Sequence, residues 1–276
     1  MKTDERLYIR ETGPTAGEEI IFLHAGGVSG WTWLPVMERL ESFHCLAPDL
    51  PQHGCSANTG PFSIQGAADQ IAALIRERCR DGQAHVAGVS AGAQIATALL
   101  ASAPECVRSA IISSALLEPL PGQGLLTPGM LRLIYRTCMA PLINWDPWIR
   151  LNMQYSAGLP ERYYEAFKRD FQTTTESAFL NLMQANLGFR LPSGLENVTL
   201  PVLVVVGSKE YAVMHRSARR LAQALPSAQA FQVNLGKGAS RAVEHNWNIQ
   251  APELFARTVL AWVTGSPLPA ELLPLD

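Results

Sequence analysis

The stretch Gln83–Leu100, QAHVAGVSAGAQIATALL, decides the fold of this chain. A short apolar run from His85 to Val89 ends in the pentapeptide GVSAG (residues 88–92), and Ala- and Leu-rich residues of high helix propensity follow at once. This is the pattern G-x-S-x-G between an expected strand and an expected helix, the context in which it exposes a serine nucleophile. By itself, the pattern also fits a tight turn that happens to contain a serine, so the rest of the chain has to decide.

A sharp turn at Ser90 would make neighbouring side chains collide unless they are small. Gly88, Ala91 and Gly92 remove that bulk. The serine hydroxyl would then stand at the end of the strand. The amide of Ala91 would point from a helix N-terminus, where developing negative charge is favoured. We therefore expect Ser90 to be a nucleophile and the Ala91 N–H to be one donor of an oxyanion hole.

The composition is that of an ordinary globular chain. Its 276 residues are 47% hydrophobic and 17% charged, with a formal net charge of −2. This length suits one large domain or one domain with an insertion. Lys and Arg are scattered along the chain, which argues against a nucleic-acid partner.

Five cysteines, an odd number, lack the spacing of metal ligands, and the N-terminal stretch MKTDERLYIR is polar. These features predict reduced thiols in a cytoplasmic protein. No apolar run reaches the ~18 residues of a membrane span, so we expect no membrane partner.

Apolar strands alternate with helices through most of the chain, which predicts a mostly parallel sheet covered on both faces, an α/β architecture. The expected strands are Arg6–Arg10, Glu19–Leu23, Phe43–Ala47, His85–Val89, Val107–Ser113, Pro201–Val206 and Ala230–Asn234. The expected helices are Trp31–Leu40, the segment capped by Ser63 and ending near Cys79, the segment after Ser90, His215–Leu225 and Pro252–Val263. The tail, residues 267–276, is expected to be a loosely packed extension.

The alternation stops between Pro119 and Asn197. That segment has helical stretches, no convincing strand and many aromatic residues. We therefore expect a core domain made of residues 1–118 and 198–276, with residues 119–197 inserted as a helical cap. The aromatic side chains could form the core of the cap itself, but some of them, such as Trp145 or Trp148, could reach a substrate.

Four features in this order resemble the α/β-hydrolase family. They are His24-Ala25-Gly26-Gly27, Asp49-Leu50-Pro51-Gln52-His53-Gly54, the GVSAG turn, and His245-Asn246-Trp247-Asn248 followed by Pro252-Glu253-Leu254-Phe255. The resemblance covers nearly the whole chain and implies an α/β-hydrolase fold. Three residues depart from the usual family glycines: Ala25, Gln52 and Glu244.

The resemblance also implies the partners of Ser90. A serine hydroxyl needs a base, and histidine has a suitable pKa. His245 follows the last strand of the alternation, where the family places its base. The family's acid typically falls three residues after the glycine that closes the PVLVVV strand, which selects Glu210. Glu118 is the alternative acid, and Asp49 is a weaker candidate that a turn-stabilising role explains better.

One oxyanion amide is Ala91, and the resemblance places the other at Gly26 rather than Gly27. The sequence has no phosphate loop, dinucleotide fingerprint or metal cluster, so a reaction without cofactor or metal is the default expectation. We therefore predict a serine hydrolase with a Ser-His-Glu triad that forms an acyl-enzyme. Its substrate would be a small to medium, largely apolar ester, lactone or related acyl compound.

Two other functions remain open. A carbon–carbon bond hydrolase of the same family often has Asn before the nucleophile and Trp after the histidine, where this chain has Val89 and Asn246. A weakly catalytic receptor for a small ligand could use the same scaffold, because a fold does not determine a function. Haloalkane dehalogenases match less well because their nucleophile is aspartate.

Overall fold

A computed structural model describes residues 6–275. Its centre is an eight-stranded sheet in the order β1-β3-β2-β4-β5-β6-β7-β8. The six inner strands run parallel, and the short edge strands β1 and β8 are antiparallel to β3 and β7. The strands are β1 (Ile9–Thr12), β2 (Glu19–Leu23), β3 (His44–Pro48), β4 (Ala84–Val89), β5 (Val107–Ser113), β6 (Val202–Gly207), β7 (Ala228–Val233) and β8 (Leu272–Pro274).

The inner strands are apolar on both faces because helices cover both sides of the sheet. In β2, Ile21 and Leu23 belong to one hydrophobic cluster, while Ile20 and Phe22 belong to the other, as the two-residue period of a strand requires. Helices α2 (Ile64–Arg78), α3 (Ala91–Ser102) and α8 (Ala212–Ala224) cover the first face. The second is covered by α1 (Leu34–Met37), α10 (Trp247–Gln250) and α11 (Pro252–Thr264).

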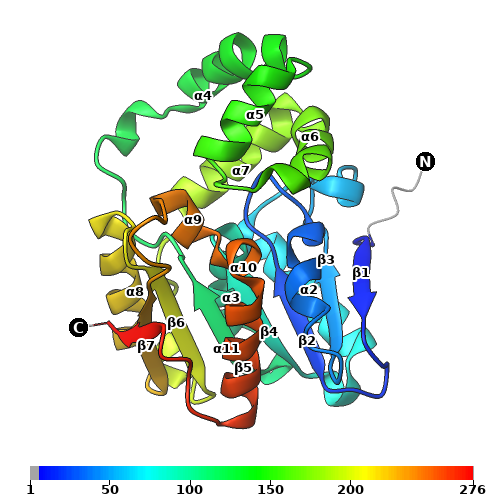
Figure 1. Cartoon of the computed structure of the whole chain (residues 1–276), viewed down its shortest axis with the longest axis vertical. Coiled ribbons are helices and arrows are strands. Elements are labelled where there is room, and N and C mark those ends of the chain that lie inside the picture. Colours follow the sequence, from blue (N-terminus) through cyan, green and yellow to red (C-terminus); the bar gives the residue numbers. More distant parts are fainter. Residues whose placement is uncertain (1–5, 276) are drawn as a thin grey trace.

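The α/β-hydrolase fold predicted from the sequence is confirmed, and a set of helices between β5 and β6 lies above one edge of the sheet as a cap (Figure 1). These helices are α4 (Pro128–Ile134), α5 (Asp146–Tyr155), α6 (Tyr164–Thr173) and α7 (Glu176–Gly188). They pack partly on themselves, through a third hydrophobic cluster that joins Ile149, Met153 and Phe167 to Val28 and Trp31 of the core. Many of the cap's aromatic residues therefore form its own core.

Three expected elements differ from the structure. The first strand begins at Ile9, because the N–H of Tyr8 donates to the side chain of Ser56 instead of to β3. The expected helix Trp31–Leu40 is a 3₁₀ turn, Gly30–Trp33, followed by the single turn α1.

The third difference is at the C-terminus. Leu272, only 5% exposed, pairs with Val233, so the expected loose tail contains the edge strand β8. A strand of three residues is too short to show a periodic signal in the sequence, which is why the prediction was wrong there.

Candidate active site

Ser90 lies in a strained turn between β4 and α3. Its backbone has φ 56° and ψ −115°, a region that non-glycine residues rarely adopt. A Cβ at Gly92 would lie 2.1 Å from the carbonyl oxygen of Leu23, and one at Gly88 would lie 2.4 Å from that of Gly92. No side chain fits at either position, so Gly92 allows α3 to begin against the end of β2, and Gly88 allows it to begin against β4.

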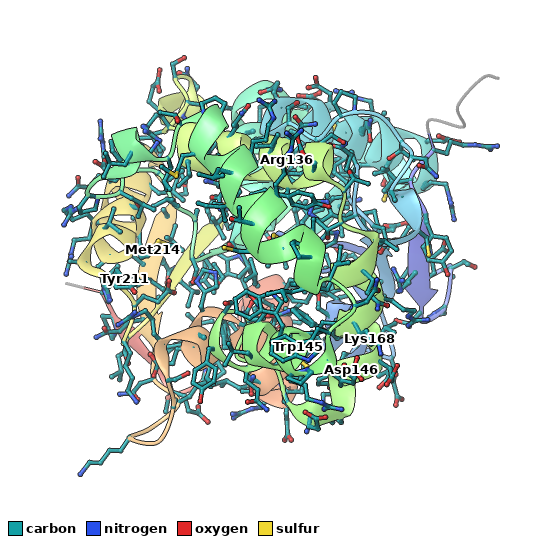
Figure 2. All side chains as sticks on the ribbon, turned by 90° about the horizontal axis from the view of Figure 1, so that it is seen from above. Arg136, Trp145, Asp146, Lys168, Tyr211 and Met214 are labelled. Carbon is teal, nitrogen blue, oxygen red and sulfur yellow. The ribbon has the colours of Figure 1, made fainter. Side chains whose placement is uncertain are left out.

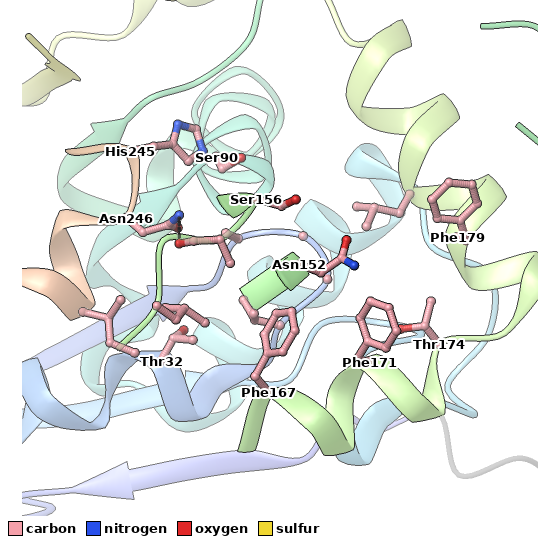
Figure 3. A pocket seen from close by; sticks show the side chains of 18 of the residues that line it. Thr32, Ser90, Asn152, Ser156, Phe167, Phe171, Thr174, Phe179, His245 and Asn246 are labelled. Atoms are coloured by element: carbon pink, nitrogen blue, oxygen red, sulfur yellow. Dashed lines mark hydrogen bonds between the residues drawn. The ribbon is translucent and has the colours of Figure 1, made fainter. Parts of the chain in front are cut away.

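His245 ends the short helix α9 (Arg241–His245), which follows β7. Its Nδ1 lies 2.9 Å from Oε2 of Glu210. Its ring lies beside the side chain of Ser90 in the cavity (Figure 3). Within residues 6–275 we find no direct hydrogen bond between the Ser90 hydroxyl and this ring. Catalytic hydrogen bonds of this kind often tighten only when substrate binds.

The carboxylate of Glu210 is fixed in position by burial and by hydrogen bonds. Its side chain is 2% exposed, and Oε1 accepts bonds from the hydroxyl of Ser114 and from the Gly207 N–H at 3.0 Å. Burial raises the pKa of Glu210, but the charge of His245 and the bonds from His245, Ser114 and Gly207 outweigh it and leave the pKa below its usual value. For His245, burial lowers the pKa, but Glu210 more than compensates and raises it.

The alternative acids have other partners. Glu118 forms an ion pair with Arg220 near the start of the cap segment. Asp49 accepts backbone bonds from Gly30 and Cys55, both at 2.8 Å, and pairs with Arg10. Asp49 therefore stabilises the turn after β3, as expected from the sequence, and neither carboxylate contacts His245.

The five other histidines have structural contacts or lie elsewhere. Nε2 of His24 accepts the backbone N–H of Leu50 at 2.9 Å, and Nδ1 of His53 bonds to the carbonyl of Pro51. His44 and His85 pair with glutamates near the sheet margin, and His215 lies on α8.

The candidate oxyanion donors are backbone amides near Ser90. Ala91 is the first residue of α3, fully buried, and Gly26 lines the cavity that Ser90 faces. Among the described residues, no hydrogen bond leads from either N–H to another protein group. Both amides therefore have no partner in this part of the chain, and that of Gly26 belongs to a residue that lines the cavity.

Two of the three departures from the family pattern have defined structural roles. Gln52 has φ 61°, a backbone conformation that favours glycine, the usual family residue at this position. Its Oε1 accepts hydrogen bonds from the Phe62 N–H and from Asn181 of the cap, both at 2.8 Å. Glu244 is fully buried and accepts bonds from the Ser208 hydroxyl and the Lys209 N–H. It thereby ties the loop that carries Glu210 to the helix that carries His245.

The cavity between core and cap measures about 530 Å³. None of its lining residues is Asp, Glu, Lys or Arg, and the lining residues supplied by the cap are mainly apolar (Figure 3). Trp145 and Trp148, which the sequence suggested as possible substrate contacts, are not among them. The cap residues that line it are Met139, Asn152, Ser156, Ala157, Leu159, Phe167, Phe171, Thr174, Phe179, Leu182 and Met183.

Sequence reasoning missed Ser114 as a partner of Glu210, and it missed the polar cap residues Asn152 and Ser156. No motif marks these three positions. Ser114 follows directly after β5 and has φ 58°, so only the neighbourhood of β5 and β6 in the sheet brings its hydroxyl to Glu210.

The comparisons with known proteins agree with this architecture. The model of the alpha/beta hydrolase family matches residues 20–258. The chain belongs to this family. An AB hydrolase superfamily protein from Gibberella zeae is 28% identical over 276 residues, covering 97% of this chain and 87% of that protein.

Solved structures of hydrolases have the same fold as this family member. The enol-lactonase from Burkholderia xenovorans LB400 has a TM-score of 0.73 and 22% identity, over 94% of this chain and 96% of its own. A thermophilic esterase from Thermogutta terrifontis has a TM-score of 0.71 and 16% identity, over 94% and 93% of the two chains. Within residues 6–275, no helix is long and apolar enough to cross a membrane.

Proposed function

We propose that this family member is a cofactor-independent serine hydrolase that cleaves an ester, lactone or related acyl bond of a small, largely apolar molecule. Ser90 is the nucleophile, His245 the general base and Glu210 the acid that orients the histidine. The amides of Ala91 and Gly26 form the oxyanion hole. The observation that carries the proposal is the hydrogen bond that His245 Nδ1 donates to Glu210, which leaves Nε2 for Ser90 in the lining of a largely apolar cavity.

In this mechanism the oxygen of Ser90 attacks the acyl carbon while Nε2 of His245 takes the hydroxyl proton. The carbonyl oxygen becomes an oxyanion, which the two backbone amides stabilise. When the carbon–oxygen bond to the leaving group breaks, His245 returns the proton to the leaving oxygen. Water then gives its proton to His245, attacks the acyl-enzyme and releases the acid, which regenerates Ser90.

The lining of the cavity supports the substrate class. Apart from the proposed base His245, the lining has no ionisable side chain to pair with a charged acyl group, and burying an unpaired charge is costly. Phe167, Phe171 and Leu182 instead offer apolar contact. The enol-lactone and ester hydrolases with the same fold act on bonds of the proposed kind, as their names state.

The test is hydrolysis of short aryl esters, together with covalent labelling by a fluorophosphonate, in the wild type and in Ser90→Ala. We expect the substitution to abolish labelling and to lower kcat by about 10⁵-fold or more, as loss of the nucleophile does in other triads, with an unchanged circular dichroism spectrum. A variant that still turns over at the wild-type rate would refute the role of Ser90. Stoichiometric labelling without turnover of any ester in the wild type would instead favour the receptor function.

A further inference from the structure

A second cavity, also of about 530 Å³, is lined in part by His245. His245 and Ser156 line both cavities, so the two cavities are neighbours at these residues, although Ser90 lines only the first. It lies between the end of α5 and the start of α8, where Tyr211 and Met214 lie beside the cap (Figure 2). It is lined by Gln154, Tyr155, Ser156, Glu210, Tyr211, Met214, Ser240, Arg241, Ala242 and His245.

The two cavities differ in charge. His245 lines both, but the first has no Asp, Glu, Lys or Arg in its lining, whereas the second contains the guanidinium of Arg241. The carboxylate of Glu210 also borders the second cavity, but it is 2% exposed and both of its oxygens are already bonded. Arg241 is therefore the one charge in this lining that a ligand could pair with directly.

Arg241 is exposed, and one contact with Tyr211, itself 60% exposed, orients its side chain. Its guanidinium carbon lies 3.6 Å from the centre of the Tyr211 ring, a cation–π contact that leaves the N–H groups at its edge free to bond. Among the described residues, no carboxylate forms an ion pair with it. A planar guanidinium held in this way is well suited to a carboxylate or another flat anion.

Arg241 and His245 are four residues apart in α9, so their side chains lie on the same face of the helix, with Cβ atoms about 6 Å apart. In the proposed mechanism His245 protonates the leaving oxygen, so the leaving group has to lie against this histidine. A leaving group of the size of one ring, extending from His245 along this face, would reach Arg241.

We propose that the second cavity is the leaving-group site and that it selects an alcohol or phenol carrying an anionic group. The preferred substrate then has two unlike parts, an uncharged apolar acyl group under the cap and an anionic leaving group at Arg241. This inference rests on the proposed hydrolase function, and it adds a specificity-determining role for Arg241 and Tyr211.

The experiment compares two hexanoate esters of the same shape, 4-carboxyphenyl hexanoate and 4-carbamoylphenyl hexanoate. The ratio of their kcat/KM values, each divided by the rate of uncatalysed hydrolysis, measures the preference for the anion. We expect the wild type to favour the carboxylate, mainly through a lower KM. In Arg241→Gln this ratio should fall about tenfold, the size of one partly exposed charge-assisted bond.

Lys237→Gln is the matched control. It removes one positive charge from the same loop region, but Lys237 is exposed and does not line the cavity. The ratio should stay within about twofold of the wild type in this variant, because exposed charges that make no contact are screened.

A ratio near one in the wild type, or equal losses in Arg241→Gln and Lys237→Gln, would overturn the inference while ester hydrolysis itself stands. If neither hexanoate nor any short neutral aryl ester is hydrolysed, the proposed function fails and the inference fails with it.

Discussion

The α/β core and the cap contribute different things to the candidate site. Ser90, Glu210 and His245 all come from loops and helix ends that follow β4, β6 and β7 of the core. The cap supplies eleven of the lining residues of the cavity, and none of them is acidic, basic or histidine. In the proposed mechanism the core supplies the groups that cleave the bond, whereas the cap supplies about half of the cavity wall, most of it apolar.

The two regions are also held together differently. The strands of the core are joined by continuous backbone ladders, whereas the cap is joined to the core by a few separate side-chain contacts besides its apolar packing. Asn246, next to His245, donates to the carbonyl of Ala157 at 2.8 Å. Asp170 accepts bonds from Trp31 at 2.7 Å and from Ser29 at 3.2 Å. Single substitutions can therefore test each region separately.

The largest expected effect after loss of Ser90 concerns the acid of the core. Glu210→Gln keeps the size of the side chain but removes the charge that stabilises protonated His245. We expect kcat to fall about 10³–10⁴-fold in an ester assay. Glu118→Gln, which breaks only the ion pair with Arg220, should change kcat by less than about threefold. A reversed order of the two variants would assign the acid to Glu118.

The pH dependence of kcat/KM in the wild type and in Glu210→Gln also tests whether Glu210 is the acid. His245 has to be neutral to act as a base, so kcat/KM should rise with pH through its pKa. Burial lowers this pKa, and Glu210 raises it above the ordinary value. Glu210→Gln removes the second effect and leaves the first, so the acidic limb of the profile should move to lower pH. A limb that does not move would show that Glu210 does not face the titrating histidine.

A smaller effect is expected in the cap. Phe171 lines the cavity and is 7% exposed. Phe171→Leu replaces the ring by a smaller apolar side chain, so the cavity becomes slightly larger and stays apolar. We expect kcat/KM for a longer acyl chain, relative to acetate, to change about tenfold, the lower end of the range for one methylene group in an apolar pocket. Trp145→Ala, at a 55% exposed position outside the cavity lining, should leave this ratio unchanged. Equal effects of both would contradict the assigned lining.

The smallest effect concerns the contact between cap and core at Asp170. Burial raises the pKa of this carboxyl to about 6, although bonds from Trp31 and Ser29 oppose the shift. Because the folded protein favours the neutral acid, its stability should fall as pH rises from the ordinary pKa of an aspartate through about 6. Asp170→Asn removes this titration. The melting temperature of the variant minus that of the wild type should therefore be roughly 5 °C higher at pH 8 than at pH 4.5.

Asp146→Asn is the control for this effect within the cap. The hydrogen bond with Lys168 lowers the pKa of Asp146, so its contribution to stability is present at neutral pH and is lost only in acid. Its substitution should bring no gain at pH 8. A gain in both variants would point to general charge repulsion instead of the buried Asp170.

The sequence alone was sufficient for the family and for the order of the main strands and helices. Short, continuous apolar runs such as β6 were correctly predicted as strands, because inner strands of a parallel sheet are buried on both faces. The GVSAG turn was equally readable, since its geometry requires small residues at neighbouring positions. The choice of Ser90, His245 and Glu210 rested on their order along the chain, and their roles remain predictions that the experiments above test.

Only the tertiary structure decided which residues meet across the chain. Ser114 reaches Glu210 from a position 96 residues earlier, and Gln52 binds Asn181 across 129 residues. Phe171, rather than Trp145, faces the cavity because the helices of the cap pack with Trp145 turned to solvent. Strands, turns and the capping residues of helices can be predicted from local sequence patterns, since they depend on neighbours in sequence. Partners brought together by sheet order and helix packing leave no such pattern, and they decide the shape and charge of the site.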